Sequence, residues 1–403
     1  MNRRIPQLVA APILILSLAL AACADDSESG GTDETTTTEA AASKLSADQA
    51  EAAATTYADQ VFAAYTATVE STTAMQTAIE AFVADPTDAT LTAAKDAWLA
   101  ARDVYGPTEV FRFYDGPIDD PDDGPEGQIN AWPMDEAYVD YVEDDPDAGL
   151  IADTEGVPEI TVDAIVAANE EGGETNISTG WHAIEFLLWG QDLSEDGPGT
   201  RPVTDYTTSP VAERRAAYLT AVTGLLVEDL QGLAEQWDPE GGDYRQEFLA
   251  DPTQAVSNIL RGMGALSAGE LAGERIAVAY ETKDQEDEHS CFSDNTIADV
   301  VNNAKGIQMA YTGEYEGVDG TSLSDVVAEV APELDAELTG SLAANVAAAE
   351  GLGRIGTFES IIRSEDDSEG RTAMLELIES LQAQGDLIAQ VGGELGLQIS
   401  LEI

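Results

Sequence analysis

Apolar and polar positions along this chain follow a helical period over most of its length. Alanine and leucine are abundant, aromatic residues make up 6% of the chain, and no stretch sustains the alternation of a half-buried strand. The pattern therefore predicts an all-α fold. The expected helices cover residues 45–84, 88–105, 161–168, 180–190, 211–237, 253–279, 297–311, 324–330, 333–349 and 371–391.

The breaks between these helices carry recognisable signals. Ser46 is a suitable N-cap for the first helix, Asp85-Pro86 ends it, and Gly106-Pro107 ends the second. Gly, Pro and Asp are concentrated in residues 115–135, which predicts an irregular loop.

The length that follows residue 44 suits two domains better than one. We expect an N-terminal helical-bundle domain at 45–203 and a C-terminal helical-bundle domain at 204–403. A faint similarity between the regions around Trp98-x3-Arg102 and Arg354 to Glu359 is consistent with a duplicated bundle.

The first residues have the features of a bacterial lipoprotein signal. Arg3 and Arg4 precede an apolar run, residues 8–20, that is too short and wrongly flanked for a membrane-spanning helix. Residues 20–23 resemble a lipobox, so we expect residues 1–22 to be removed and Cys23 to carry the lipid. An ordinary secretory signal cut near Ala22 is the alternative. The acidic, threonine-rich residues 23–44 then predict a disordered tether at the cell envelope, on its periplasmic or outer face.

The charge of the chain excludes several classes of partner. It has 17 basic and 78 acidic residues and a formal charge of −61, which becomes −63 once Arg3 and Arg4 leave with the signal. Such a protein does not bind nucleic acid through phosphate contacts and does not dock on anionic lipid by charge. The balance fits a surface exposed to high external salt. With Cys23 acylated, Cys291 has no partner for an internal disulfide, and we expect its thiol to be buried.

The segment Gly180–Asp192 places one of only two histidines three residues before a glutamate in an otherwise apolar helix. His182 and Glu185 share one face of that helix, as the ligands of di-iron helical bundles do. The apolar surroundings predict burial, and a buried carboxylate is costly unless it is paired or binds a metal. Glu185 therefore requires a partner. That partner is a metal or, if the pair is purely structural, an arginine across the bundle.

Four blocks of sequence resemble the imelysin-like family, whose hallmark is Gly-x-His-x-x-Glu. They are Gly180–Asp192, the block from Ala97 to Arg112, Asn-Ala-Trp-Pro-Met-Asp at 130–135, and residues 281–295. The last block is similar to the branch usually called iron-regulated protein A. The resemblance implies a two-domain, all-helical fold with its site where the domains meet, an envelope location and a link to iron supply.

The resemblance also implies which residues form the site. Gly180, His182 and Glu185 match the family motif, and Ile297 stands near the position where a further histidine is expected. A site that needs this extra imidazole would be weaker here. The implied metal is iron, bare or chelated, with another divalent metal as the alternative. The expected metal ligands are His182, Glu185, Glu109 and His289, and the expected ligand-binding residues are Arg102, Tyr105, Trp98, Gly180 and Asp294.

The residue types support this set in part. Iron(III) and similar hard cations prefer carboxylate, phenolate and imidazole ligands. Arg102 cannot bind a metal, but a guanidinium holds a carboxylate or a carboxylate-bearing chelate. Each candidate also has a structural role open to it: Glu109 could cap a helix, Tyr105 could pack in the core, and His289 could be a solvated loop residue.

Three functions fit the sequence. The first is a lipid-anchored protein that binds iron or an iron-bearing ligand and acts in iron uptake with an envelope transport partner. The second is a metal-dependent peptidase with Glu185 as general base, since the family has been classed with metallopeptidases. The chain lacks His-Glu-x-x-His and Gly-x-Ser-x-Gly, and two histidines cannot form a three-imidazole zinc site. The third is a structural or partner-binding protein in which His182, Glu185 and Arg102 hold the bundles together.

Overall fold

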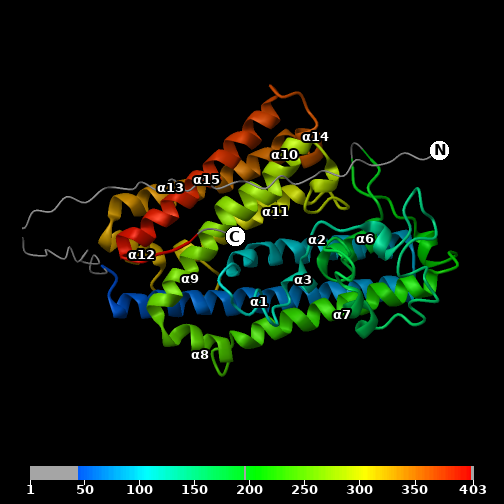
Figure 1. Cartoon of the computed structure of the whole chain (residues 1–403), viewed down its shortest axis with the longest axis horizontal. Coiled ribbons are helices and arrows are strands. Elements are labelled where there is room, and N and C mark those ends of the chain that lie inside the picture. The colour runs from blue at the N-terminus through cyan, green and yellow to red at the C-terminus, as the bar shows by residue number, and fades with distance from the viewer. Residues whose placement is uncertain (1–43, 195–196, 401–403) are drawn as a thin grey trace, which may run out of the picture. The chain divides into compact units, whose positions relative to one another are not determined.

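The computed structural model describes residues 44–194 and 197–400, and every regular element in these ranges is helical (Figure 1). This confirms the predicted all-α fold class. The first half contains α1 (Ala47–Ala84), α2 (Asp88–Tyr105), η1 (Gly106–Phe111), α3 (Glu126–Ile129), α4 (Glu136–Val139), α5 (Val162–Ala168), α6 (Gly180–Trp189) and η2 (Val203–Tyr206).

The second half of the chain supplies the elements from α7 to α15. Of these, α7 and α8 lie low in Figure 1, and α10, α11, α13, α14 and α15 lie in its upper part. Their bounds are α7 (Ala212–Gln236), α8 (Asp243–Ala250), α9 (Pro252–Gly264), η3 (Ala265–Ala277), α10 (Val278–Thr282), η4 (Gln285–Asp287), α11 (Thr296–Thr312), α12 (Leu323–Val330), α13 (Pro332–Ile355), α14 (Phe358–Ile362) and α15 (Glu369–Leu395).

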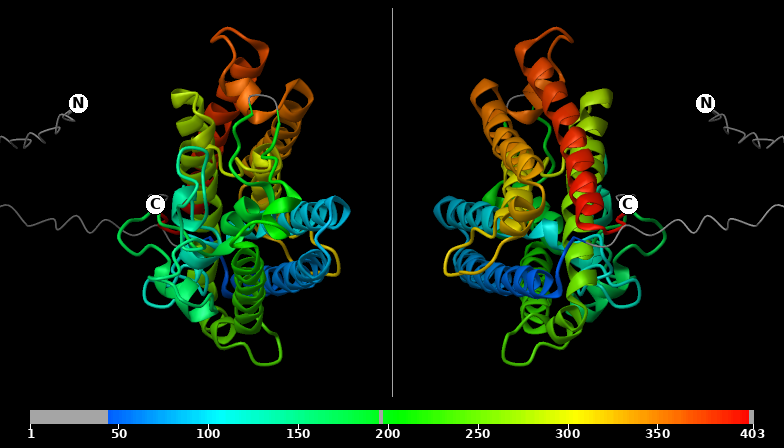
Figure 2. Two further views of the ribbon diagram at one scale, coloured as in Figure 1. Left: turned by 90° about the vertical axis from the view of Figure 1, so that its right-hand side faces the viewer. Right: turned by 90° about the vertical axis from the view of Figure 1, so that its left-hand side faces the viewer.

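The described helices pack in two groups that share one hydrophobic core. In the first group α1 contacts both α2 and α7, and in the second α15 contacts η3 and α13, while α11 also packs on α13. The views in Figure 2 show the first group below and the second above. Contacts of α11 with η1 and of α1 with α9 join the groups.

Contacts unite residues Ala42–Ile403 in one compact unit, so the expected two-domain arrangement and the duplication are not confirmed. Among the described residues, no helix combines the length and apolar character needed to cross a membrane. The predicted signal at 1–22, Cys23 and the tether up to residue 43 lie outside the described residues.

Local sequence signals set most helix ends as expected. Ser46 and the side chain of Gln49 form a capping box at the start of α1, and α2 covers the predicted residues Asp88–Tyr105. The predicted helix at 253–279 differs, because α9 passes into the wider i to i+5 turns of η3. Within η3, the hydroxyl of Ser267 donates to the carbonyl of Leu381 in α15 at 2.8 Å. This segment is therefore shaped by tertiary packing.

Candidate functional site

The motif helix α6 is buried along its whole length, and its first residue fixes its position. Gly180 has a φ of 78°, and a Cβ at this position would lie 2.3 Å from the carbonyl oxygen of Ile129. Only glycine tolerates this conformation and this close approach. The contact brings Asn130, the next residue after Ile129, beside the start of the motif helix.

His182 and Glu185 lie one helical turn apart, as the motif predicts. Nδ1 of His182 is 2.9 Å from Oε2 of Glu185. The other oxygen, Oε1, accepts the backbone N–H of Ser293 at 2.9 Å and its hydroxyl at 2.6 Å. Burial raises the pKa of Glu185 to about 8 and lowers that of His182. The partners of Glu185 are thus a histidine and a serine, while Nε2 of His182 is buried without a hydrogen bond.

The second histidine is held in the same manner by another carboxylate. His289 precedes α11, and its Nδ1 lies 3.0 Å from Oδ2 of Asp299. Asp299 also accepts Nε–H of Arg102 at 3.0 Å and the hydroxyl of Ser290 at 2.5 Å. Burial, followed by the nearby charges of Arg275 and Arg102, lowers the pKa of His289. This ring is therefore neutral and buried, and it is not the solvated loop residue that the sequence left open.

The two histidines of the chain converge in the fold. Their ring centres are 4.7 Å apart with the planes at 69°, and Trp132 packs against His182 at 4.8 Å. His182 comes from the first half of the chain and His289 from the second. We call the two rings with their carboxylate partners, Glu185 and Asp299, the histidine site.

A second buried cluster, the arginine network, lies next to the histidine site. It consists of Arg102, Glu109, Asn130, Arg275 and Asn303. Arg275 forms an ion pair with Glu109, whose oxygens also accept the amides of Asn130 and Asn303 at 3.3 Å each. Arg102 lies 3.7 Å from Glu109 and donates to Asn130 at 2.6 Å. Burial alone would raise the pKa of Glu109, but Arg275 and Arg102 lower it to about 2.

The remaining predicted residues differ in how closely they approach the site. The indole N–H of Trp98 donates to the carbonyl of Trp181 at 3.2 Å, and Arg102 lies 5.1 Å from the ring centre of Tyr105. The hydroxyl of Tyr105 is buried without a hydrogen bond, and burial raises its pKa. Trp98 and Tyr105 therefore pack beside the site and do not join its hydrogen-bond network.

Asp294 follows Ser293, but no hydrogen bond or ion pair joins its side chain to either histidine. It adopts a φ of 58° and is half-buried. Burial, with Glu359 and Asp192 nearby, raises the pKa of Asp294 to about 7. Asp294 is thus near the site in sequence but is not brought into its hydrogen-bond network.

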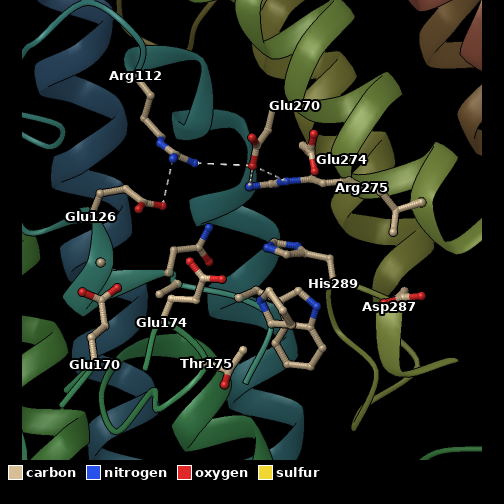
Figure 3. Close-up of a pocket in the computed structure, with 16 residues that line it drawn as sticks. Arg112, Glu126, Glu170, Glu174, Thr175, Glu270, Glu274, Arg275, Asp287 and His289 are labelled. Carbon is tan, nitrogen blue, oxygen red and sulfur yellow. Dashed lines mark hydrogen bonds and ion pairs between the residues drawn. The ribbon is translucent and has the colours of Figure 1, made fainter. Parts of the chain in front are cut away.

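A cavity of about 570 Å³ opens beside His289, the one residue of the histidine site that lines it. Figure 3 shows His289 pointing into it, with Arg112 and Arg275 on the upper wall. Arg112 pairs with Glu126 at 3.0 Å, and Arg275 pairs with Glu270 at 3.1 Å. Its other carboxylates belong to Glu170, Glu174, Glu274 and Asp287.

Several residues of the site were not found from the sequence. Asp299 and Asn303 lie four residues apart on α11, and this polar pair on a buried helix face is a signal that periodicity analysis could use. Asn130 and Trp132 stand inside a block that pointed to the family but carried no site prediction. Ser293 has no comparable signal, because its role depends on Glu185 from a distant part of the chain.

Together, the fold and the site define an all-helical protein whose two histidines meet in a buried polar centre beside a cavity. Two of the residues that form this centre, His182 and Glu185, carry the Gly-x-His-x-x-Glu resemblance. The chain belongs to the imelysin family, whose model matches residues 61–388.

Individual relatives agree with this assignment. The chain is 27% identical over 295 residues to iron-regulated protein A of Synechococcus elongatus, covering 70% of each protein. It also resembles the crystal structure of a protein described as an iron-regulated protein A precursor from Parabacteroides distasonis, with a TM-score of 0.67 and 20% identity. That match covers 87% of this chain and 97% of the other, and it supports the fold.

Proposed function

We propose that the protein binds iron, or an iron-bearing ligand, through the histidine site and acts in iron uptake at the cell envelope. The observation that carries the proposal is Nε2 of His182, which is buried and has no hydrogen-bond partner among the described residues. A buried polar atom without a partner costs about 1–3 kcal/mol. A bound metal would remove this cost, because a neutral imidazole nitrogen is a good ligand for iron and related metals.

The surroundings of both rings suit that role. Metal-binding histidines commonly donate the other ring N–H to a carboxylate, which fixes the ring and leaves a lone pair for the metal. Glu185 and Asp299 lie 2.9 and 3.0 Å from the Nδ1 atoms. Asp299 would accept such a proton, and Glu185, whose pKa is raised to about 8 by burial, would accept one in its ionised form. With Nδ1–H of His182 donated in this way, its Nε2 carries the lone pair. Nη2 of Arg102 also lies 3.2 Å from Nδ1 of His289, so Nε2 of His289 carries the lone pair only in the tautomer that donates Nδ1–H to Asp299.

The two glutamates expected as metal ligands are already engaged. Glu185 accepts two hydrogen bonds from Ser293 as well as contacting His182, and Glu109 is paired with Arg275. Either carboxylate would have to exchange these partners for a metal bond. The proposal therefore gives the ligand role first to the two imidazoles, with Glu185 as a positioning residue.

A structural role is the competing function, and the arginine network favours it. Arg102 donates hydrogen bonds to Asp299 of α11 and to Asn130, and all three residues are buried. Such a network can hold helices in one arrangement without any ligand. Under that function, replacing Glu185 would lower stability and would change no binding property.

Iron binding to the purified protein, measured by calorimetry in high salt, separates the two functions. High salt suppresses weak binding by the acidic surface. We expect one tight site in the parent and in the surface control Glu228→Gln. His182→Ala should lose this site, and Glu185→Ala should bind at least tenfold more weakly. Equal stoichiometry and affinity in all four proteins would overturn the proposal and leave the structural function.

The envelope location has a separate test. It rests on Arg3, Arg4 and the lipobox that ends at Cys23, and the structural relative is itself described as a precursor. Cells given labelled fatty acid should incorporate the label into the parent and not into Cys23→Ser. Label retained by Cys23→Ser would refute lipidation at this residue.

A further inference from the structure

We infer that the occupant of the histidine site is a chelated metal, whose small oxygen-donor chelator fills the neighbouring cavity and leaves two adjacent coordination positions for His182 and His289. This inference rests on the proposed function and narrows it from iron in any form to one class of complex. The inference depends on the number of protein ligands, the ring geometry, the size of the cavity and the buried donors in its walls that make no hydrogen bond.

The protein offers too few ligands to complete a coordination sphere. Within residues 44–194 and 197–400, no three histidine, cysteine or acidic side chains are grouped so that they could hold a metal ion. Two imidazoles fill two positions of the octahedral sphere that iron commonly adopts, and about four remain. Those positions must be filled by water or by a chelator that arrives with the metal.

The ring separation fits adjacent positions on one metal. Two imidazoles bound through Nε2 at about 2.1 Å have ring centres about 4.6 Å apart on adjacent octahedral positions and about 6.5 Å apart on opposite ones. The observed distance between the centres of His182 and His289 is 4.7 Å. This separation matches adjacent positions, and it is also that of an ordinary edge-to-face contact between two rings.

The cavity is far larger than a hydrated ion requires. Four water molecules occupy about 120 Å³ at about 30 Å³ each, whereas pockets for small organic ligands measure about 300–1,000 Å³. The cavity beside His289 measures about 570 Å³. Its volume matches a metal complex with a small chelator.

The walls carry buried donors that make no hydrogen bond, although Nη1 of Arg112 lies 3.8 Å from carboxylate oxygens of Glu109 and Glu270. Nε and Nη1 of Arg112 and the indole N–H of Trp132 are buried without hydrogen bonds, and both residues border the cavity. Oxygen atoms of a chelator would satisfy these donors. The lining has more carboxylates than guanidinium groups, which disfavours a strongly anionic complex. The expected ligand is thus an oxygen-rich complex of low net charge.

Iron(III)–nitrilotriacetate is a suitable probe because this neutral complex uses four positions of the metal and leaves two adjacent ones open. The matched control is iron(III)–EDTA, whose chelator can occupy all six positions. In high salt we expect one nitrilotriacetate complex per chain, at least tenfold weaker binding in His182→Ala and in His289→Ala, unchanged binding in Glu228→Gln, and no binding of the EDTA complex.

Iron(II) alone, titrated without oxygen, separates this inference from the proposed function. Tight iron(II) binding that needs both histidines, with no binding of the nitrilotriacetate complex, would overturn the chelate and keep the iron site. No binding of either probe would overturn both. Binding of the complex that survives in both histidine variants, or equal binding of the EDTA complex, would also overturn the inference.

A spectroscopic measurement avoids dependence on the folding of the variants. Pulsed electron paramagnetic resonance of copper(II)–nitrilotriacetate bound to the parent detects the remote nitrogen of each coordinated imidazole. Two imidazoles on one copper are expected. A spectrum with one imidazole or none would contradict the paired site.

Discussion

Glu109 provides the sharpest test of how the buried charges stabilise the fold, and we predict that Glu109→Gln is strongly destabilising at neutral pH. The carboxylate is fully buried, pairs with Arg275 and lies 3.7 Å from Arg102. Removing one member of a buried ion pair costs about 3–5 kcal/mol, since the partner charges stay buried without compensation.

The pKa of Glu109 leads to a similar magnitude. The two guanidinium groups lower this pKa from 4.5 to about 2. At about 1.4 kcal/mol per unit, a shift of that size corresponds to about 3 kcal/mol at pH 7. A folded region of this size unfolds with an entropy of about 0.8 kcal/mol per kelvin, so the melting temperature should fall by about 4–6 °C.

The pH dependence of stability is a second test of this prediction. Because the folded-state pKa is depressed, the stabilisation is fully present above the unfolded pKa near 4.5 and is lost as the pH falls towards about 2. Thermal unfolding followed by circular dichroism should therefore show a large deficit for Glu109→Gln at pH 7 that shrinks below pH 4. The exposed control Glu174→Gln should stay within about 0.5 kcal/mol of the parent. A Glu109→Gln protein as stable as the parent at pH 7, or a deficit that does not change with pH, would refute the reasoning.

Three further predictions concern other parts of the fold. Gly180→Ala should destabilise by at least about 1–3 kcal/mol, because its Cβ would lie 2.3 Å from a carbonyl oxygen, whereas Gly232→Ala has nothing within 4 Å and should be neutral or stabilising in thermal unfolding. Asp140→Asn should cost about 3–5 kcal/mol in urea unfolding, since this buried carboxylate accepts Nε–H and Nη2–H of Arg215 at 2.6 and 2.8 Å; an unchanged midpoint would contradict this. Cys291 is 2% exposed, and burial raises the pKa of its thiol, so in a Cys23→Ser protein this thiol should react with a disulfide reagent only after unfolding; rapid reaction of the native protein would contradict this burial.

Much of the site was predictable because its members occur in short, regular patterns. The three-residue spacing of His182 and Glu185 on an apolar helix required them to share a buried face, and both lie there. The sequence also required a partner for Glu185 but named metal or arginine. The partners are His182 and Ser293, and Ser293 belongs to an irregular turn whose position no local pattern specifies.

The partners of Glu109 also could not be predicted from the sequence. A carboxylate near a histidine motif has the right chemistry for a metal ligand, and the resemblance to the family supported that role. In the fold, its oxygens face Arg275 and the amides of Asn130 and Asn303. The elements that carry these partners, η3, the loop after α3 and α11, are far from Glu109 in sequence, so the pairing could not be deduced from spacing.

The sequence by itself determined the helical class, the ends of helices such as α2, the burial of α6 and the strongly acidic character of the protein. These properties follow from the period of apolar residues, from capping residues and from composition, all of which act over a few neighbouring positions. The tertiary structure alone decided that the only two histidines meet at 4.7 Å, that a carboxylate orients each ring, and that a cavity opens beside them. These relations depend on how helices distant in sequence pack against one another, and that packing is set by the whole core.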